Sequence, residues 1–299
     1  MGPTACGKSA IAMKLKRLLP VELISVDSAL IYREMDIGTD KPTNSELLCN
    51  PYHLINIKDP SEVYSVGAFQ KDVLKVIKYV LSLGKIPLLV GGTMFYFKTL
   101  LEGLPRLPAS NYDLRSYLYL TNKKNKTILY NKLRKIDPIS SKRIHPHDLQ
   151  RVLRALEIFY ISGKTLTELT QLKNYIFPYK VVQFSIVPKD KNWLVDNIYA
   201  RFKKMLLLGF QSEVERLLHR GDLNSELPSM RCVGYRQMWS YLTKNISYEE
   251  MVYTSIIATQ KLAKNQLTWL KNWKSLHKLK SHNNSDVLSY KIVQILKNL

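Results

Sequence analysis

Short apolar runs alternate with amphipathic helical patterns in the first third of the chain. Residues 11–18 carry apolar side chains at helical spacing, and Pro20 ends that pattern. The run 21–26 is short and apolar enough for a buried strand, and 86–90 is a second such run after a helical pattern over 69–80. Helices that alternate with short apolar strands are typical of βαβ units, so the sequence predicts an α/β protein with a parallel sheet.

The middle of the chain has a different pattern. Between about 105 and 180 we find no convincing buried strand, and the clearest signal is the helical spacing over 149–159. Strand character returns at 181–187, which we expect to rejoin the sheet, and helical patterns follow at about 198–206 and 248–273. The predicted organisation is therefore a core, a helical insertion and a return to the core, at residues 1–108, 109–180 and 181–299.

Composition narrows the class of protein. The 299 residues are 45% apolar and 10% aromatic, which excludes a disordered or fibrous chain. No apolar run approaches the ~18 residues of a membrane span, so we expect a soluble cytosolic protein with no membrane partner. Cys6, Cys49 and Cys232 lie far apart and form no CxxC pair, which argues against zinc and against a disulfide framework.

The net charge points to a class of partner. The chain has 45 Lys and Arg against 24 Asp and Glu, and 45 − 24 gives +21. A field of this sign favours a polyanion, with nucleic acid first. The alternative is a solvated basic surface without a partner.

The strongest motif lies at the start of the chain. Gly2–Ser9 reads G-x-x-x-x-G-K-S, and a helical pattern follows directly. Backbone N–H groups of such a loop bind phosphate oxygens, Lys8 adds a charge, and the Ser9 hydroxyl can hold Mg²⁺. The motif is typical of ATP- and nucleotide-binding proteins, but it specifies only a pyrophosphate-like group. Such loops follow a strand, so we expect either a misassigned start codon or a sheet that lacks this strand.

Two further candidates follow the predicted strands. Asp27 comes directly after 21–26, at the carboxyl edge of the sheet where ligands of open α/β folds bind. A metal ligand, a general base and a simple turn cap are equally compatible with this position. Gly91-Gly92-Thr93 ends the other strand; its small residues suit close approach to a ligand, although an ordinary turn has the same composition.

Cations gather in three later segments. Arg151 and Arg154 share one helix face, Arg231 and Arg236 flank an aromatic residue, and three lysines lie near two tryptophans over 261–273. Each cluster alone is more often a solvated surface, but together with the net charge they favour RNA or DNA. His145 and His147 have no further donors nearby in sequence, and we assign no metal to them.

These motifs resemble the bacterial tRNA dimethylallyltransferases of the IPP transferase family. The matching segments are GPTACGKS, VELISVDSALIY, MDIGT-x-KP, LLVGGTMFYF, HP-x-D-x-QR-x-x-RALE, ISGK and RCVGYRQMW, and they occur in family order. The resemblance implies transfer of a dimethylallyl group from dimethylallyl diphosphate to N6 of adenosine 37 of tRNA, with Mg²⁺ as cofactor. It also implies a P-loop NTPase-like parallel core, an inserted all-helical domain that grips the anticodon stem-loop, and a monomer.

The resemblance assigns roles to particular residues. It makes Asp27 the general base and Thr93 a catalytic residue near the reacting amine, and it places Mg²⁺ on Ser9 with the diphosphate. It implies donor-diphosphate contacts for Gly2, Pro3, Thr4, Ala5, Cys6, Gly7, Lys8, Ser9 and Arg201. It implies tRNA contacts for Asp27, Ser28, Ala29, Leu30, Thr93, Arg115, Gln150, Arg151, Val152, Leu153, Arg154, Arg231, Cys232, Val233, Gly234, Tyr235, Arg236, Lys264, Asn265, Gln266, Leu267, Thr268, Trp269, Leu270 and Lys271. Gln260 and Asn265 stand where the family usually has arginines.

Three alternatives stay open at this point. A transferase that prenylates free AMP or ADP would share the loop and Asp27 without needing a basic insertion. A small-molecule kinase of the P-loop type would use ATP and ignore dimethylallyl diphosphate. A non-catalytic RNA-binding protein would keep the cationic surface alone.

Overall fold

Tertiary contacts divide the chain into two compact units. The structure is a computed structural model that describes all residues except 125–126, 172–174, 282–283 and 299. Unit 1 comprises Met1–Thr99 and Tyr179–Leu299, and unit 2 comprises Leu100–Pro178; the boundaries expected from the sequence are 108/109 and 180/181. The helix α4 (Met94–Glu102) runs from unit 1 into unit 2.

Unit 1 contains a small parallel sheet with β1 in the centre. The strand order is β2-β1-β3, and β1 pairs along its whole length with β3 so that Val26 lies opposite Gly91. Leu23, Ile24 and Val26 are fully buried, as expected for a central strand between helices. The predicted strands and their helices are confirmed as α1 (Lys8–Leu18), β1 (Val21–Val26), α3 (Val66–Ser82) and β3 (Ile86–Gly91), with α2 (Asn44–Cys49) and β2 (Tyr52–His53) in addition.

The strand expected at 181–187 forms at Phe184–Val187 (β4), but the expectation that it rejoins the first sheet is wrong. It pairs in parallel with β5 (His277–Lys280) in a separate two-stranded sheet. The opposite edge of β4 bonds to Met1, whose carbonyl accepts the N–H of Ile186 at 2.9 Å. Gly2 follows and lies beside both Ile186 and Gly92.

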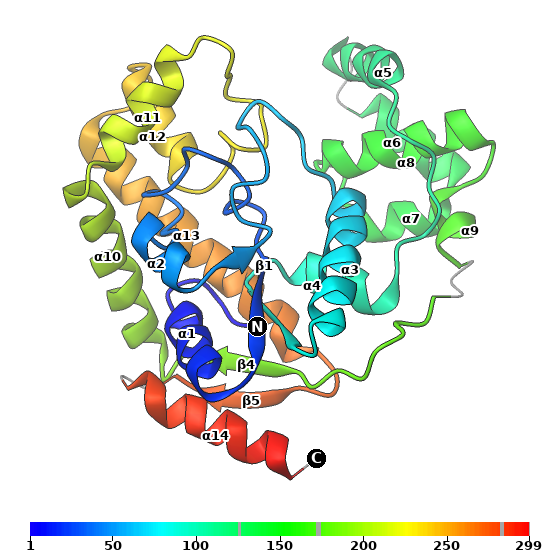
Figure 1. Ribbon diagram of the computed structural model, residues 1–299. Coiled ribbons are helices and arrows are strands. Elements are labelled where there is room, and N and C mark those ends of the chain that lie inside the picture. The colour runs from blue at the N-terminus through cyan, green and yellow to red at the C-terminus, as the bar shows by residue number, and fades with distance from the viewer. Residues whose placement is uncertain (125–126, 172–174, 282–283, 299) are drawn as a thin grey trace. The chain divides into compact units, whose positions relative to one another are not determined.

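The second half of unit 1 is mostly helical (Figure 1). Its long helix confirms the pattern predicted over 248–273. The remaining elements are α10 (Lys191–Leu207), α11 (Phe210–His219), α12 (Tyr235–Leu242), α13 (Tyr248–Lys271) and α14 (Ser285–Lys297). No helix in the described residues combines the length and the apolar character needed to cross a membrane.

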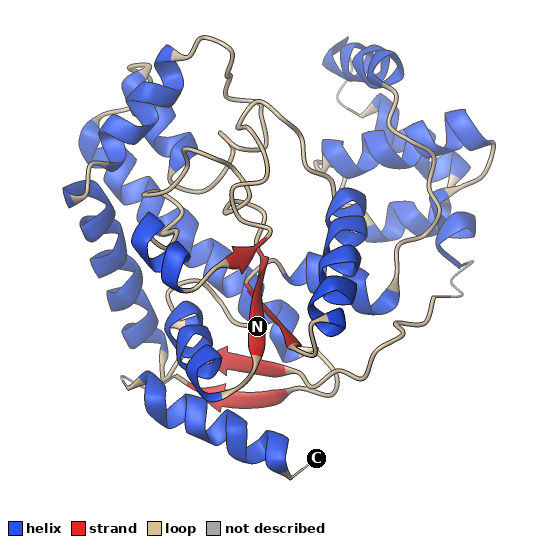
Figure 2. Ribbon diagram, in the orientation of Figure 1, coloured by secondary structure: helices blue, strands red, loops and turns tan. Residues whose placement is uncertain are grey.

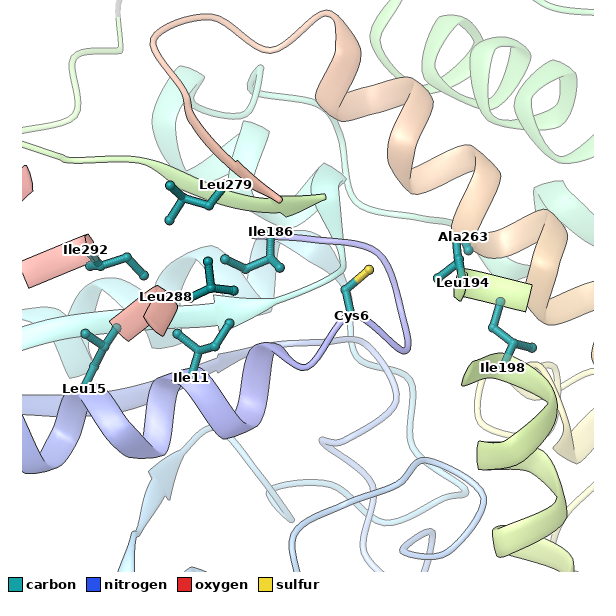
Figure 3. Packing of buried hydrophobic residues seen from close by; sticks show 10 residues of the cluster. All are labelled: Cys6, Ile11, Leu15, Ile186, Leu194, Ile198, Ala263, Leu279, Leu288 and Ile292. Carbon is teal, nitrogen blue, oxygen red and sulfur yellow. The ribbon is translucent and has the colours of Figure 1, made fainter. Parts of the chain in front are cut away.

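A hydrophobic core anchors the start of the chain. Cys6 lies in one cluster with Ile11 and Leu15 of α1, Ile186 of β4 and Leu288 of α14, as Figure 3 shows. The burial of each aliphatic side chain stabilises this arrangement by about 1.5–3 kcal/mol. The predicted phosphate loop is therefore held by its own buried side chain as well as by the helix that follows it.

Unit 2 consists of helices and loops, and its described residues contain no strand (Figure 2). Its helices are α5 (Tyr112–Lys124), α6 (Ile128–Ile136), α7 (Pro138–Arg143), α8 (Leu149–Ser162) and α9 (Leu166–Gln171). Leu118, Leu129 and Leu156 meet in its core. Asp148 caps the start of α8 by accepting the N–H of Arg151, and Gly163 ends the helix with a φ of 67°.

Candidate active site

The loop Thr4–Ser9 has the backbone of an anion-binding nest. Ala5 has a φ of 60° and Gly7 a φ of 75°, so left-handed residues alternate along the loop. Helix α1 begins at Lys8 without a side-chain cap and without an acidic residue in its first turn. Its first N–H groups therefore meet no side-chain acceptor, and the helix dipole adds positive potential at the loop.

Side chains from distant helices hold this loop in place. Gln266 of α13 accepts the N–H of Thr4 at 2.8 Å and donates to the carbonyl of Gly92 at 2.9 Å. Arg201 of α10 donates to the hydroxyl of Thr4 and also contacts the carbonyl of Thr39. The loop is thus tied to the end of β3 and to the loop that follows β1.

Lys8 occupies a low-dielectric position in the loop. Its Nζ donates to the carbonyl of Pro3 at 2.5 Å, which leaves further ammonium hydrogens for a ligand. Burial lowers the pKa of Lys8 to about 8, an effect that the charge of Asp27 partly offsets. Burial also raises the pKa of the Cys6 thiol to about 11, so that thiol is neutral near pH 7.

Asp27 and Thr93 lie at the same edge of the sheet because β1 and β3 run in register. The Oδ1 atom of Asp27 accepts the N–H of Ala29 at 2.8 Å and that of Leu30 at 3.4 Å, which is the turn-capping role considered from the sequence. Its Oδ2 atom has no hydrogen-bond partner among the residues that the structure describes. One carboxylate oxygen therefore fixes the turn, and the other is available for chemistry.

The Thr93 hydroxyl binds the neighbouring Ser28. It accepts the N–H of Ser28 at 3.1 Å and donates to the Ser28 hydroxyl at 3.4 Å. The close approach at Gly91 is to β1, because a Cβ there would lie 1.9 Å from the carbonyl oxygen of Val26. Gly91 thus serves the close pairing of the two strands; the sequence left open whether this segment approaches a ligand or forms an ordinary turn.

The segment 231–236 also approaches Asp27. Burial raises the pKa of Cys232 to about 12, and the charge of Asp27 contributes to this shift. Arg231 and Arg236 are exposed, whereas Tyr235 is fully buried. The two arginines can meet a polyanion, and Tyr235 supports the segment from inside.

Helix α13 presents its cations to solvent. Lys264, Asn265, Thr268 and Lys271 are exposed, and Trp269 lies 5.6 Å from the Nζ of Lys98. Leu270 is buried and Gln266 faces the phosphate loop, so these two side chains act inside the protein.

In unit 2, two of the three predicted RNA-binding arginines bind a buried carboxylate. Glu157 is fully buried and accepts two hydrogen bonds from Arg115 at 2.9 Å and one from Arg154 at 2.5 Å. Burial alone would raise the pKa of Glu157, but these bonds outweigh it and lower the pKa. Val152 is buried, and Arg151 remains largely exposed beside Asp148. Arg115 and Arg154 therefore stabilise the fold of unit 2 through Glu157, while part of each side chain stays exposed.

Sequence reasoning missed Glu213 and Asp40. Asp40 forms an ion pair with Arg201 at 3.3 Å, and Glu213 binds the backbone just before it. The available signal for Glu213 was a carboxylate among the apolar positions of a helix, since Phe210, Val214 and Leu217 beside it are all buried. No group of three or more His, Cys, Asp or Glu that could hold a metal occurs among the described residues.

The phosphate-binding nest, the parallel strands and the acidic residue at their carboxyl edge define a P-loop-type α/β protein. The chain belongs to the IPP transferase family, since a family model described as IPP transferase matches residues 30–273. A tRNA dimethylallyltransferase of Buchnera aphidicola subsp. Baizongia pistaciae is 59% identical over 298 residues, which are 99% of this chain and 92% of that protein. One from Buchnera aphidicola subsp. Acyrthosiphon pisum (strain Tuc7) is 58% identical and covers 99% of this chain and 98% of its own.

Solved structures agree with this family. The tRNA isopentenylpyrophosphate transferase of Bacillus halodurans is 33% identical with a TM-score of 0.73, and it covers 99% of this chain and 94% of its own. A eukaryotic dimethylallyltransferase acting on tRNA is 25% identical with a TM-score of 0.78, and it covers 94% of this chain and 73% of its own.

Proposed function

We propose that this protein is a tRNA dimethylallyltransferase, which moves the dimethylallyl group of dimethylallyl diphosphate to N6 of adenosine 37 in tRNA. The observation that carries the proposal is that Asp27, the carboxylate at the end of β1, lies near Lys8 of the candidate phosphate loop. Asp27, with one oxygen open, lies close enough to Lys8 of the phosphate loop for its charge to raise the pKa of that lysine. The relatives described above supply the substrate class, because they are named for this activity.

The donor's diphosphate binds the nest, with Lys8 and Arg201 as its cationic partners. Negative charge grows on the diphosphate as the bond between C1 of the prenyl group and oxygen breaks, so fixed N–H groups and cations there lower the barrier. Mg²⁺ would neutralise part of the same charge. The residues present fit this ion, since Ser9 offers a hydroxyl in the first turn of α1 and Mg²⁺ takes its other ligands from phosphate oxygens and water.

Asp27 acts on the acceptor. The N6 lone pair attacks C1, the electrons of the C1–O bond leave with the diphosphate, and the proton of N6 passes to Oδ2 of Asp27. The Thr93 hydroxyl, held by Ser28, orients the amine beside this carboxylate. A base within the stacked anticodon loop is not accessible to such a site, so the adenosine must flip out of its stack.

Exposed cations bind the tRNA in this proposal. Arg231, Arg236, Lys264 and Lys271 are the exposed basic residues of unit 1 assigned to the anticodon stem-loop, and Arg151 is the most exposed of those in unit 2. The protein acts as a monomer in the cytoplasm, where its tRNA substrate occurs. Prenylation of free AMP and phosphoryl transfer from ATP are the competing activities.

The test is transfer of labelled dimethylallyl diphosphate to tRNA in the presence of Mg²⁺, with analysis of the nucleosides. Parallel reactions with AMP, and with ATP in place of the prenyl donor, distinguish the competing activities. Asp27→Asn should lower kcat by about 10²–10⁴-fold, the usual contribution of a positioned base, while the Kd for tRNA stays the same. The exposed Asp196→Asn on α10 is the matched control. Preferential labelling of AMP, consumption of ATP, or an active Asp27→Asn variant would overturn the proposal.

A further inference from the structure

Glu213 is the most heavily bonded buried carboxylate near the active site. It is 2% exposed, and its Oε2 accepts the N–H groups of Asp36 at 2.9 Å and Ile37 at 2.7 Å. Its Oε1 accepts the N–H of Gly38 at 3.0 Å and the hydroxyl of Tyr235 at 2.5 Å. One carboxylate therefore joins the loop 36–38 to the first residue of α12.

The loop 36–40 connects Glu213 to Arg201, the residue proposed to bind the donor diphosphate. Thr39 and Asp40 come next in the chain, and both contact Arg201 at 3.3 Å, through a backbone carbonyl and a carboxylate respectively. Arg201 in turn donates to Thr4 of the phosphate loop. The position of the Arg201 guanidinium thus depends on the loop that Glu213 holds.

Tyr235 connects Glu213 to the segment 231–236, which is assigned to RNA binding. It directly follows residues 231–234, and Arg236 comes after it on the exposed face of α12. Its ring packs edge-on against Phe210 at 5.1 Å between centroids. The hydroxyl of this buried tyrosine is therefore the point where Glu213 holds the RNA-facing segment.

The loop 36–38 packs closely against the rings of Phe210 and Tyr235. A Cβ at Gly38 would lie 2.1 Å from Cε2 of Phe210 and 2.6 Å from Cε2 of Tyr235, so the loop backbone lies directly on the two rings. Buried polar networks of this kind rigidify a structure when every group is satisfied. The loop and the two rings are therefore in direct contact at the place where Glu213 binds both the loop and Tyr235.

We propose that Glu213 is a positioning residue for both substrates: it orients Arg201 toward the donor diphosphate through loop 36–40, and it orients segment 231–236 toward the RNA through Tyr235. The proposal rests on the proposed function, but it concerns binding and is tested without turnover. A residue that merely stabilises the fold would, when changed, lower the free energy of unfolding and leave the Kd of the folded protein for each substrate unchanged. A positioning residue acts only through its two partners.

The test measures the Kd for dimethylallyl diphosphate and for tRNA separately. Glu213→Gln should weaken donor binding about tenfold in the wild-type background, because the amide nitrogen cannot accept the loop N–H groups. In an Arg201→Ala background the same change should alter donor binding by no more than about twofold, since its effect passes through Arg201. An equal effect in both backgrounds would overturn the donor half of the proposal.

The second variant addresses the RNA half. Tyr235→Phe leaves the three loop N–H bonds to Glu213 intact, so it should weaken tRNA binding and leave donor binding unchanged. A donor effect as large as the tRNA effect, or no effect on tRNA, would refute this half even if Glu213→Gln fails to fold. Val214→Ala, a fully buried neighbour on α11, is the control for lost stability, and it should leave both Kd values unchanged. Prenyl transfer measured alongside reports separately on the proposed function.

Discussion

The charge of Lys8 should make donor binding depend on pH. Its pKa is lowered to about 8 by burial, so the free protein carries this charge only partly at mildly alkaline pH. A bound diphosphate favours the charged form and raises the pKa again. Binding above pH 8 therefore requires uptake of a proton, and donor affinity falls as pH rises.

The size of the effect follows from that pKa. The charged fraction of Lys8 falls from about nine-tenths at pH 7 to about one-tenth at pH 9, so the Kd for dimethylallyl diphosphate should rise about tenfold, or about 1.4 kcal/mol. The donor's own phosphate titrates near pH 6, outside this range. The pKa of Cys6 is about 11 and that of Cys232 about 12, so neither thiol titrates here.

The measurement is calorimetric titration of dimethylallyl diphosphate into the protein without tRNA, between pH 7 and pH 9 at constant ionic strength. Lys8→Arg is the informative control, because a guanidinium stays charged throughout and the dependence on pH should flatten. Lys8→Ala should bind weakly at every pH. A constant Kd for the wild type, or an equal slope in Lys8→Arg, would refute the reasoning that the burial of Lys8 controls its charge.

Two further changes test buried polar contacts, one in unit 2 and one at the candidate phosphate loop. Glu157→Gln should lower the free energy of unfolding by about 1.5–3 kcal/mol in urea denaturation, because a buried acceptor of two arginines loses its charge; unchanged stability would contradict the buried ion-pair assignment. Gln266→Ala removes both bonds that join the phosphate loop to Gly92, so the KM for the donor should rise about tenfold. Gln260→Ala on the same helix is its control, and an equal rise in both variants would point to general damage of α13.

The hydrophobic pattern predicted the core elements and the parallel sheet of β1 and β3, but not that β4 belongs to a second sheet. The apolar runs that form β1 and β3 are long enough to be recognised, and Asp27 and Thr93 follow from their ends. Strand β5 reads His-Lys-Leu-Lys, and only Leu279 of its residues is buried. A strand with one core side chain has no alternation to detect, so the partner of β4 was not predictable.

Side-chain partners were the harder part of the site. Arg154 and Glu157 lie three residues apart, a spacing that already suggests a helical ion pair. Arg115 meets the same carboxylate from 42 residues away, and nothing in its local sequence indicates this. Local periodicity shows which face of a helix is buried, whereas the contacts that decide whether an arginine is structural or RNA-facing come from distant segments.

The proposed donor site contains residues from both halves of the chain. The candidate phosphate loop lies at the start, but Gln266 and Arg201 bond to it, and Cys6 shares a core cluster with Ile186. Those supports come from the same second half of unit 1 that carries the exposed arginines and lysines assigned to RNA. A division into an N-terminal donor domain and a C-terminal RNA domain therefore does not describe the molecule. Because α13 bonds to the candidate phosphate loop through Gln266 and exposes Lys264 and Lys271 to solvent, we expect a shift of this helix on binding RNA to move the loop as well.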